Sequence, residues 1–107
     1  MCIRDREWGY IKDIAAILVA GLNIQTQPGQ AINVAQNAGQ AVGDSARLIA
    51  EAVGFEGSLK FNTSFQDGAM RKVLDDRVFR SLFPDFSFTD HRQGIRETVA
   101  YYRSILK

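Results

Sequence analysis

The residues whose types and spacing could perform chemistry lie between Phe61 and Arg77. This stretch reads Phe-Asn-Thr-Ser-Phe-Gln-Asp-Gly-Ala-Met-Arg-Lys-Val-Leu-Asp-Asp-Arg. Asp-Gly favours a tight turn, because glycine accepts a positive φ and aspartate can bond its own backbone. The turn would present Asp67, Arg71 and Lys72 near one edge. A carboxylate that accepts hydrogen bonds from hydroxyls, beside two cations that can hold phosphate, suits a phosphorylated sugar.

The same stretch has a simpler interpretation, as a loop between a strand and a helix with solvated charges. Charged turns of this kind are common in globular proteins. The spacing alone favours this simpler interpretation, and only the resemblance described below reverses the preference.

Helical periodicity predicts the main elements that must position these residues. Apolar residues recur on one helical face over 11–22, again over 42–53, and once more after Asp90, which is a helix-starting residue. Gly54 is expected to end the second helix in the left-handed conformation. A shorter helix that starts at Asp75 or Asp76 and carries Val78, Phe79 and Leu82 is expected to stop before Pro84.

Three short strands are expected between these helices, at 31–34, 58–63 and 70–74. Strands this few and this short cannot build a full sheet. The expected fold class is therefore α/β, a helix-rich α+β lobe with a few short strands that packs against another body.

Composition limits the classes of partner. The chain has 107 residues, of which 46% are apolar and 23% charged, with a formal net charge of +1. This balance indicates neither a nucleic-acid-binding surface nor an anionic-membrane surface. No apolar run approaches the roughly 20 residues of a membrane span. Cys2 is the single cysteine, so an internal disulfide cannot form, which fits a cytoplasmic location.

The first six residues, Met-Cys-Ile-Arg-Asp-Arg, resemble the translated adaptor sequence found at the start of some assembled reading frames. We therefore expect residues 1–6 to be a non-native leader, and residues 7–107 to form the functional lobe.

Several common chemistries have no motif in this sequence. It contains no Gly-x-Gly-x-x-Gly dinucleotide fingerprint, no Gly-x-x-x-x-Gly-Lys-Ser/Thr phosphate loop and no Tyr-x-x-x-Lys pair. His91 is the single histidine, so a zinc site is not expected. We interpret His91 as a residue at the surface or at the edge of the core. Trp8 and the Tyr101-Tyr102 pair are interpreted as packing residues.

Three stretches resemble one known family. Arg6-Glu-Trp-Gly-Tyr-Ile-Lys-Asp13 is similar to the Arg-Asp/Glu-aromatic-x-aromatic-Val-x-Asp motif of extended short-chain dehydrogenase/reductases acting on nucleotide sugars, the NAD-dependent epimerase/dehydratase family. The stretches 32–34 and 48–54 resemble the next strand and helix. The second half, 61–75 and 94–98, resembles the C-terminal lobe of the GDP-L-fucose synthases in that family.

The resemblance implies a function that this chain alone does not complete. In the family, a Rossmann domain binds NADP or NAD and carries the catalytic Ser/Thr, Tyr and Lys, while the C-terminal lobe closes over the nucleotide-diphosphate sugar. The chain would then be the substrate-binding lobe of an epimerase/reductase, without catalysis of its own, and the parent protein would be a homodimer. No metal is implied.

The resemblance also implies roles for four residues. Asp67 matches the family aspartate that contacts substrate, and Arg71 and Lys72 match the basic pair that follows it. Arg6 matches the motif arginine that in some relatives approaches the diphosphate. Two alternatives stay open: a complete small interaction module without catalysis, and a lobe that binds sugar nucleotides but has lost its enzymatic role.

Overall fold

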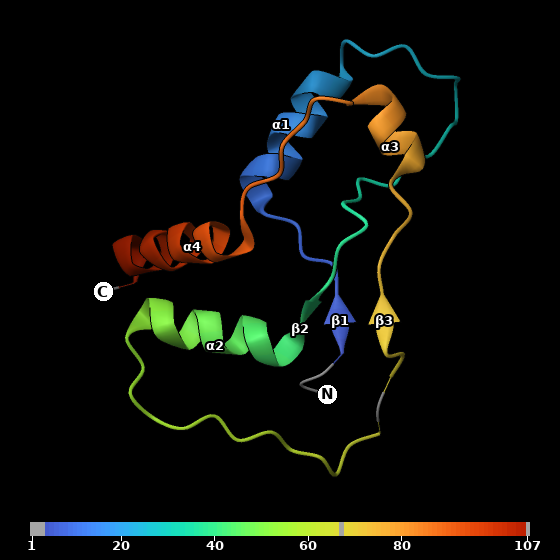
Figure 1. Ribbon diagram of the computed structural model, residues 1–107. Coiled ribbons are helices and arrows are strands. Elements are labelled where there is room, and N and C mark those ends of the chain that lie inside the picture. Colours follow the sequence, from blue (N-terminus) through green and yellow to red (C-terminus); the bar gives the residue numbers. More distant parts are fainter. Residues whose placement is uncertain (1–3, 67, 107) are drawn as a thin grey trace.

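The computed structural model describes residues 4–66 and 68–106, and within these residues it has helices and one small sheet (Figure 1). The fold class is α/β, as the sequence predicts. The elements in chain order are β1 (Asp5–Arg6), α1 (Ile11–Gly21), β2 (Gln40–Ala41), α2 (Val42–Val53), β3 (Arg71–Lys72), α3 (Arg77–Leu82) and α4 (His91–Ile105).

The sheet joins three segments that lie far apart in the sequence. Its strand order is β2-β1-β3, with β1 antiparallel to β2 and parallel to β3. Arg6 is therefore the central residue of one row across the sheet, between Gln40 and Lys72. Asp5 is the centre of the other row, between Ala41 and Arg71.

The helix ends follow the capping chemistry that the sequence contains. Gly54 has φ 73°, in the left-handed region, and its N–H donates to the carbonyl of Glu51 while the N–H of Phe55 donates to that of Ala50. These are the paired bonds of a Schellman motif. At α4 the side chain of Asp90 accepts a hydrogen bond from the backbone N–H of Gln93. Both predicted helix boundaries are confirmed.

Two predicted strands are wrong and one is shorter than expected. Residues 31–34 and 58–63 have no regular secondary structure, and every residue of 58–63 is exposed. A segment with alternating polar and apolar residues forms a strand when it pairs with a second strand and packs its apolar side on a core. Residues 58–63 have neither, so they do not form a strand. In the predicted strand at 70–74, only Arg71 and Lys72 pair with β1.

The core is small for the length of the chain. Among the described residues, the buried apolar residues are Ile17, Ala35 and Phe79. The radius of gyration is 16.6 Å, against roughly 13 Å for a compact domain of this length. The accessible surface is 8148 Å², against roughly 5,900 Å² for a self-contained monomer of this mass. The chain is thus not a sealed globule.

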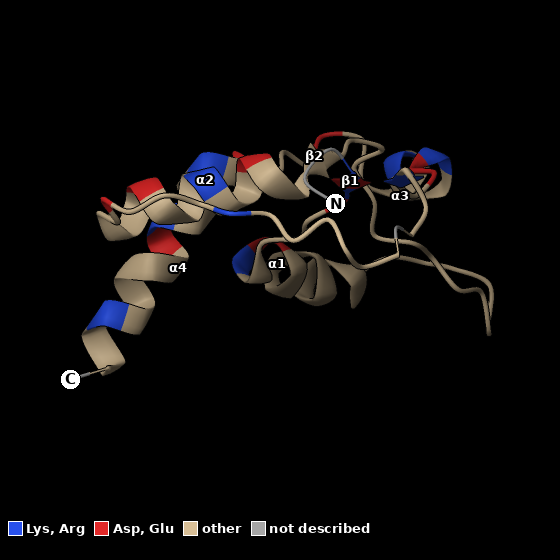
Figure 2. Ribbon diagram, turned by 90° about the horizontal axis from the view of Figure 1, so that it is seen from below, with Lys and Arg blue, Asp and Glu red and all other residues tan. Residues whose placement is uncertain are grey.

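Helix α1 displays most of the apolar face that the sequence predicts. The side chains of Ile11, Leu18, Val19 and Leu22 are all at least 66% exposed. The buried residues of α1 are instead Asp13 and Ile17, on a neighbouring face. Beyond its first turn α1 has no charged residue, and in Figure 2 its body is uniformly tan. A helical stripe of this kind requires a covering surface.

A cluster of phenylalanine rings anchors α3. The ring of Phe79 is fully buried and stacks on Phe83 at 5.0 Å, with Phe86 and Phe88 at 6.2 and 5.5 Å. The guanidinium of Arg80 lies 5.5 Å from the Phe79 ring and donates to the carbonyl of Phe86. Helix α3 ends at Leu82, before Pro84, as expected. This aromatic cluster holds the chain between β3 and α4.

Candidate functional site

Strands β1 and β3 bring three of the four predicted site residues together. Arg6 and Lys72 are register partners, and Arg71 is the partner of Asp5. The backbone N–H of Glu7 extends the ladder by donating to the carbonyl of Lys72 at 3.3 Å. The cations predicted from the sequence are therefore neighbours in space.

Strand geometry divides these cations between two faces. Successive side chains of a strand point to opposite faces, and register partners share a face. Arg6 and Lys72 are thus on one face, together with Gln40 of β2, while Arg71 is on the other with Asp5. The pair best placed to hold one anion is Arg6 with Lys72, rather than the sequence neighbours Arg71 and Lys72.

Asp67 lies outside the described residues, and the residues that follow it contact Arg6. The Arg6 guanidinium donates to the carbonyl of Ala69 at 3.1 Å and to that of Asp5 at 2.7 Å. A Cβ added at Gly68 would lie 3.7 Å from the same guanidinium. The Arg6 guanidinium is therefore held by the carbonyls of Asp5 and Ala69, close to Gly68.

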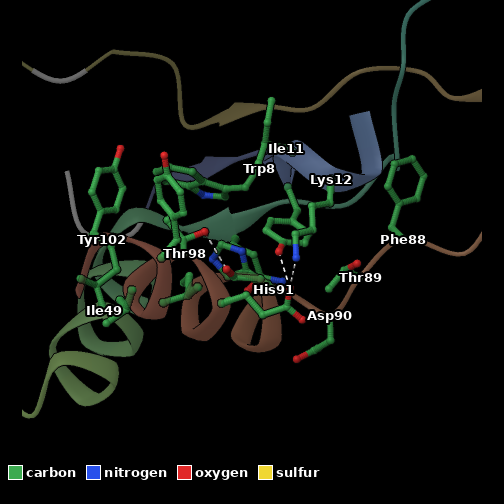
Figure 3. A pocket seen from close by; sticks show the side chains of 18 of the residues that line it. Trp8, Ile11, Lys12, Ile49, Phe88, Thr89, Asp90, His91, Thr98 and Tyr102 are labelled. Atoms are coloured by element: carbon green, nitrogen blue, oxygen red, sulfur yellow. Dashed lines mark hydrogen bonds and ion pairs between the residues drawn. The ribbon is translucent and has the colours of Figure 1, made fainter. Parts of the chain in front are cut away.

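Beside the sheet lies an open groove of about 1330 Å³ (Figure 3). Its walls come from the segment between β1 and α1, from α2, and from α4 with the residues that precede it. Trp8 and Gln40 line the groove. Because Gln40 shares a face with Arg6 and Lys72, the cationic face of the sheet and the groove are on the same side.

Glu7 fixes the sheet to its surroundings. One carboxylate oxygen accepts the backbone N–H of Gln36 at 2.5 Å, and the other accepts that of Leu74 at 2.8 Å. The side chain of Gln36 in turn donates to the carbonyl of Trp8 at 2.9 Å. Glu7 thus holds β3 just beyond Lys72, which positions that lysine beside Arg6.

Tyr10 and Lys12 connect the start of α1 with α4 through Glu97. The Tyr10 hydroxyl donates to a Glu97 carboxylate oxygen, and the Lys12 ammonium lies 3.4 Å from the same oxygen. The hydrogen bond from Tyr10, followed by those from Gln93 and Lys12, lowers the pKa of Glu97 to about 2. The same contact with Glu97 raises the pKa of Tyr10 and of Lys12. Glu97 is therefore a fixed anion and not a proton donor near neutral pH.

His91 is half-buried at the edge of the groove, in agreement with its prediction from the sequence as a surface or core-edge residue. Its Nε2 is 2.9 Å from the Oγ of Ser45 on α2, and its ring lies 5.9 Å from the Trp8 ring. Burial lowers the pKa of His91, and the charge of Asp90 opposes that shift. The imidazole is therefore neutral near neutral pH.

The aromatic packing predictions are wrong in part. Tyr101 and Tyr102 are 60% and 52% exposed, and Trp8 is 43% exposed. The two tyrosine rings contact each other edge to face at 5.5 Å. These side chains line the groove instead of filling a core.

Sequence reasoning missed the supporting roles of Glu7, Tyr10 and Asp13. All three lie in the Arg6–Asp13 motif and bond to segments that are distant in the sequence. Polar residues interleaved with aromatic ones in one short stretch are the signal that could have indicated them. Among the described residues, no helix combines the length and apolar content of a membrane span, and no cluster of three potential metal ligands occurs.

Comparison with known proteins identifies relatives over nearly the whole chain. No established family profile matches it. GDP-L-fucose synthase of Dictyostelium discoideum is 35% identical over 98 residues, 91% of this chain and 31% of that protein. GDP-L-colitose synthase of Yersinia pseudotuberculosis is 28% identical over 97 residues, again 91% of this chain and 31% of that protein. The chain spans about a third of the length of the curated relatives it matches.

Solved structures show the same fold. A GDP-L-fucose synthetase from Naegleria fowleri, bound to NADP, superposes with a TM-score of 0.86 at 28% identity, covering 97% of this chain and 33% of that one. The Bordetella bronchiseptica enzyme WbmH, in complex with NAD+, superposes with a TM-score of 0.81 at 20% identity, covering 94% and 33%. At that identity the second comparison shows the fold alone.

These comparisons confirm the predicted resemblance to the NAD(P)-dependent epimerase/dehydratase family of short-chain dehydrogenase/reductases, in the part that the chain covers. Within that family the similarity is to the GDP-L-fucose synthases, as the sequence motifs predict.

Proposed function

We propose that this chain is the substrate-binding lobe of an NAD(P)-dependent nucleotide-sugar epimerase/reductase similar to the GDP-L-fucose synthases. In this proposal the lobe binds the nucleotide-diphosphate sugar, and an NAD(P)-binding Rossmann domain of the parent protein supplies the chemistry. The lobe itself carries no catalytic residue. The parent would be a cytoplasmic homodimer that uses NADP or NAD.

The pairing of Arg6 with Lys72 across β1 and β3 carries this proposal. Two cations on one face of a strand pair provide both charge and several N–H donors for a diphosphate. Arg6 is already oriented by two backbone carbonyls, so little side-chain entropy would be lost on binding. Asp67, two residues before the Ala69 carbonyl that Arg6 contacts, would accept hydrogen bonds from sugar hydroxyls.

The exposed apolar face of α1 supports a lobe that packs on a partner. A self-contained interaction module, the alternative function, would bury such a stripe. The accessible surface, about a third larger than expected for a monomer of this mass, points the same way. We propose that the Rossmann domain covers this face.

The predicted division at residue 7, with residues 1–6 as a leader, is an alternative to a native Arg6, on which the diphosphate site depends. Arg4 is buried, its carbonyl accepts from the N–H of Val42, and Asp5 with Arg6 forms the middle strand. A leader ending at residue 6 would thus take part in the sheet. Sequencing the genomic DNA directly upstream of codon seven tests this division, because a native parent should encode a Gly-rich Rossmann motif and a Tyr-x-x-x-Lys there. Finding neither would contradict the proposed enzyme.

Calorimetric titration of the chain with a GDP-sugar tests the binding role. We expect weak binding, since the other half of the site is absent. Arg6→Gln and Lys72→Gln should each weaken it roughly tenfold, the value of one charge-assisted contact. Arg71→Gln should weaken it less, because Arg71 is on the other face. Lys60→Gln, which removes an exposed cation in the 55–70 loop, is the control and should leave affinity unchanged. Equal effects from all four substitutions would indicate non-specific attraction and reject the site.

A further inference from the structure

Trp8 has the exposure and the support of a binding surface. It is 43% exposed at the wall of the groove, although a tryptophan used only for packing is largely buried. Its backbone carbonyl is held by the Gln36 side chain, and its ring rests against the imidazole of His91. His91 is itself fixed by Ser45 of α2. The Trp8 side chain therefore lies at the wall of the groove with its ring beside the His91 ring (Figure 3).

The strand register relates this ring to the cations. Trp8 follows Arg6 by two residues, and the ladder continues through the N–H of Glu7, so Trp8 extends the face that carries Arg6 and Lys72. Gln40, in the same row as those cations, also lines the groove. One side of the sheet thus has a cationic end and an aromatic end, separated by about one strand repeat of roughly 7 Å.

We propose that Trp8 is the stacking platform for the planar base of the nucleotide whose diphosphate contacts Arg6 and Lys72. This inference rests on the proposed function and adds a residue that recognises the base. A nucleotide has the same two-part chemistry, an anionic diphosphate and a planar ring a short distance away. Stacking on an aromatic side chain tolerates different bases, and the amide groups of Gln36 and Gln40 provide donors and acceptors at the edge of the ring.

The chain offers a direct readout because Trp8 is its single tryptophan. The experiment titrates the full chain with GDP and, separately, with inorganic pyrophosphate. Indole fluorescence is excited at the red edge of its absorption, where the base does not absorb, and backbone amide shifts are followed by NMR. GDP should quench the fluorescence in a saturable manner. Pyrophosphate should shift the amides of Arg6 and Lys72 without quenching.

Substitutions complete the test. Trp8→Leu should lower the affinity for GDP roughly five- to a hundredfold, the range of a lost base–aromatic stack, and leave pyrophosphate binding unchanged. Trp8→Phe should restore most of the affinity. Phe55→Leu, at an exposed aromatic residue just beyond α2, is the matched control and should change neither ligand.

Each outcome separates this inference from the proposed function. If GDP shifts the amides of Arg6 and Lys72 but neither quenches Trp8 nor depends on it, the stacking platform is rejected and the diphosphate site stands. If quenching occurs without shifts at the two cations, the platform stands and the diphosphate assignment fails. Absence of both responses at saturating GDP rejects both.

Discussion

The buried carboxylate of Asp13 accepts two hydrogen bonds from Thr89, one from its backbone N–H at 2.8 Å and one from its hydroxyl at 2.7 Å. This contact joins the first turn of α1 to the segment that leads into α4. Figure 1 shows this segment passing beside α1.

Removing the Asp13 carboxylate should therefore destabilise the fold. Asp13→Ala leaves the N–H of Thr89 without its acceptor in a part-buried position, and we expect a loss of about 2 kcal/mol in the free energy of unfolding. Urea denaturation followed by circular dichroism measures it. Asp44→Ala is the control, because Asp44 is exposed and pairs with Arg47 on the surface of α2, where a loss below about 0.5 kcal/mol is expected. Equal losses in the two variants would contradict the structural role of Asp13.

Tyr10→Phe should raise the pKa of Glu97. The Tyr10 hydroxyl is the largest cause of the low Glu97 pKa of about 2, against an ordinary value of 4.5. A carboxyl whose folded pKa is lowered stabilises the fold above its unfolded pKa, and this stabilisation is lost as the pH falls from 4.5 through the folded pKa. The variant should move this acid transition to higher pH. NMR titration of the Glu97 side-chain carboxyl carbon measures the pKa directly; an unchanged value would show that Tyr10 does not hold the anion.

The single histidine should make stability depend on pH below about 6.5. Burial lowers the pKa of His91 from 6.5, so the unfolded chain binds more protons than the folded chain in this range. The contribution of neutral His91 to the free energy of unfolding is then fully present above pH 6.5, and it is lost as the pH decreases through the folded pKa. His91→Asn should remove this slope, even if it lowers stability at every pH. The imidazole proton signal, unique in this chain, gives the folded pKa, and a value above 6.5 would overturn the prediction.

The exposed stripe of α1 should tolerate polar substitution, and its buried face should not. Leu18→Gln with Leu22→Gln should leave the free energy of unfolding within about 0.5 kcal/mol and reduce self-association, because both side chains face solvent. Ile17→Ala, one residue away on the buried face, should cost about 2–4 kcal/mol. Urea denaturation and light scattering after size exclusion measure the two effects. Destabilisation by the leucine substitutions would show that the chain covers this stripe itself.

The sequence predicts the helices well because their signals are local. Gly54 ends α2 and Asp90 starts α4 through bonds within a few residues, and these chemistries can be read from the chain. The strands fail for the opposite reason. A two-residue strand such as β3 exists only because β1 lies beside it, and no local alternation indicates that partner.

The candidate site divides in the same way. Residue types and the family motif indicate Arg6, Arg71 and Lys72. Which of these side chains share a face of the sheet depends on the register of β1 and β3, which pairs Arg6 with Lys72. The roles of Glu7 and Asp13 depend on backbone groups far along the chain, which no spacing rule predicts. The residue type of Trp8 predicts packing, because aromatic residues usually pack, and its exposure follows from a groove that the sequence does not reveal.

The central position of β1 has a consequence for how this chain acquires its structure. Among the three strands of the described sheet, β1 is synthesised first, and its parallel neighbour β3 lies 65 residues later in the sequence, so the loop that joins them closes slowly. During synthesis, the edge of β1 that pairs with β3 therefore stays unpaired until residues 71–72 have been synthesised. In that interval the unpaired edge can pair with a second copy of the chain, and this is the misassembly to which the topology is most vulnerable.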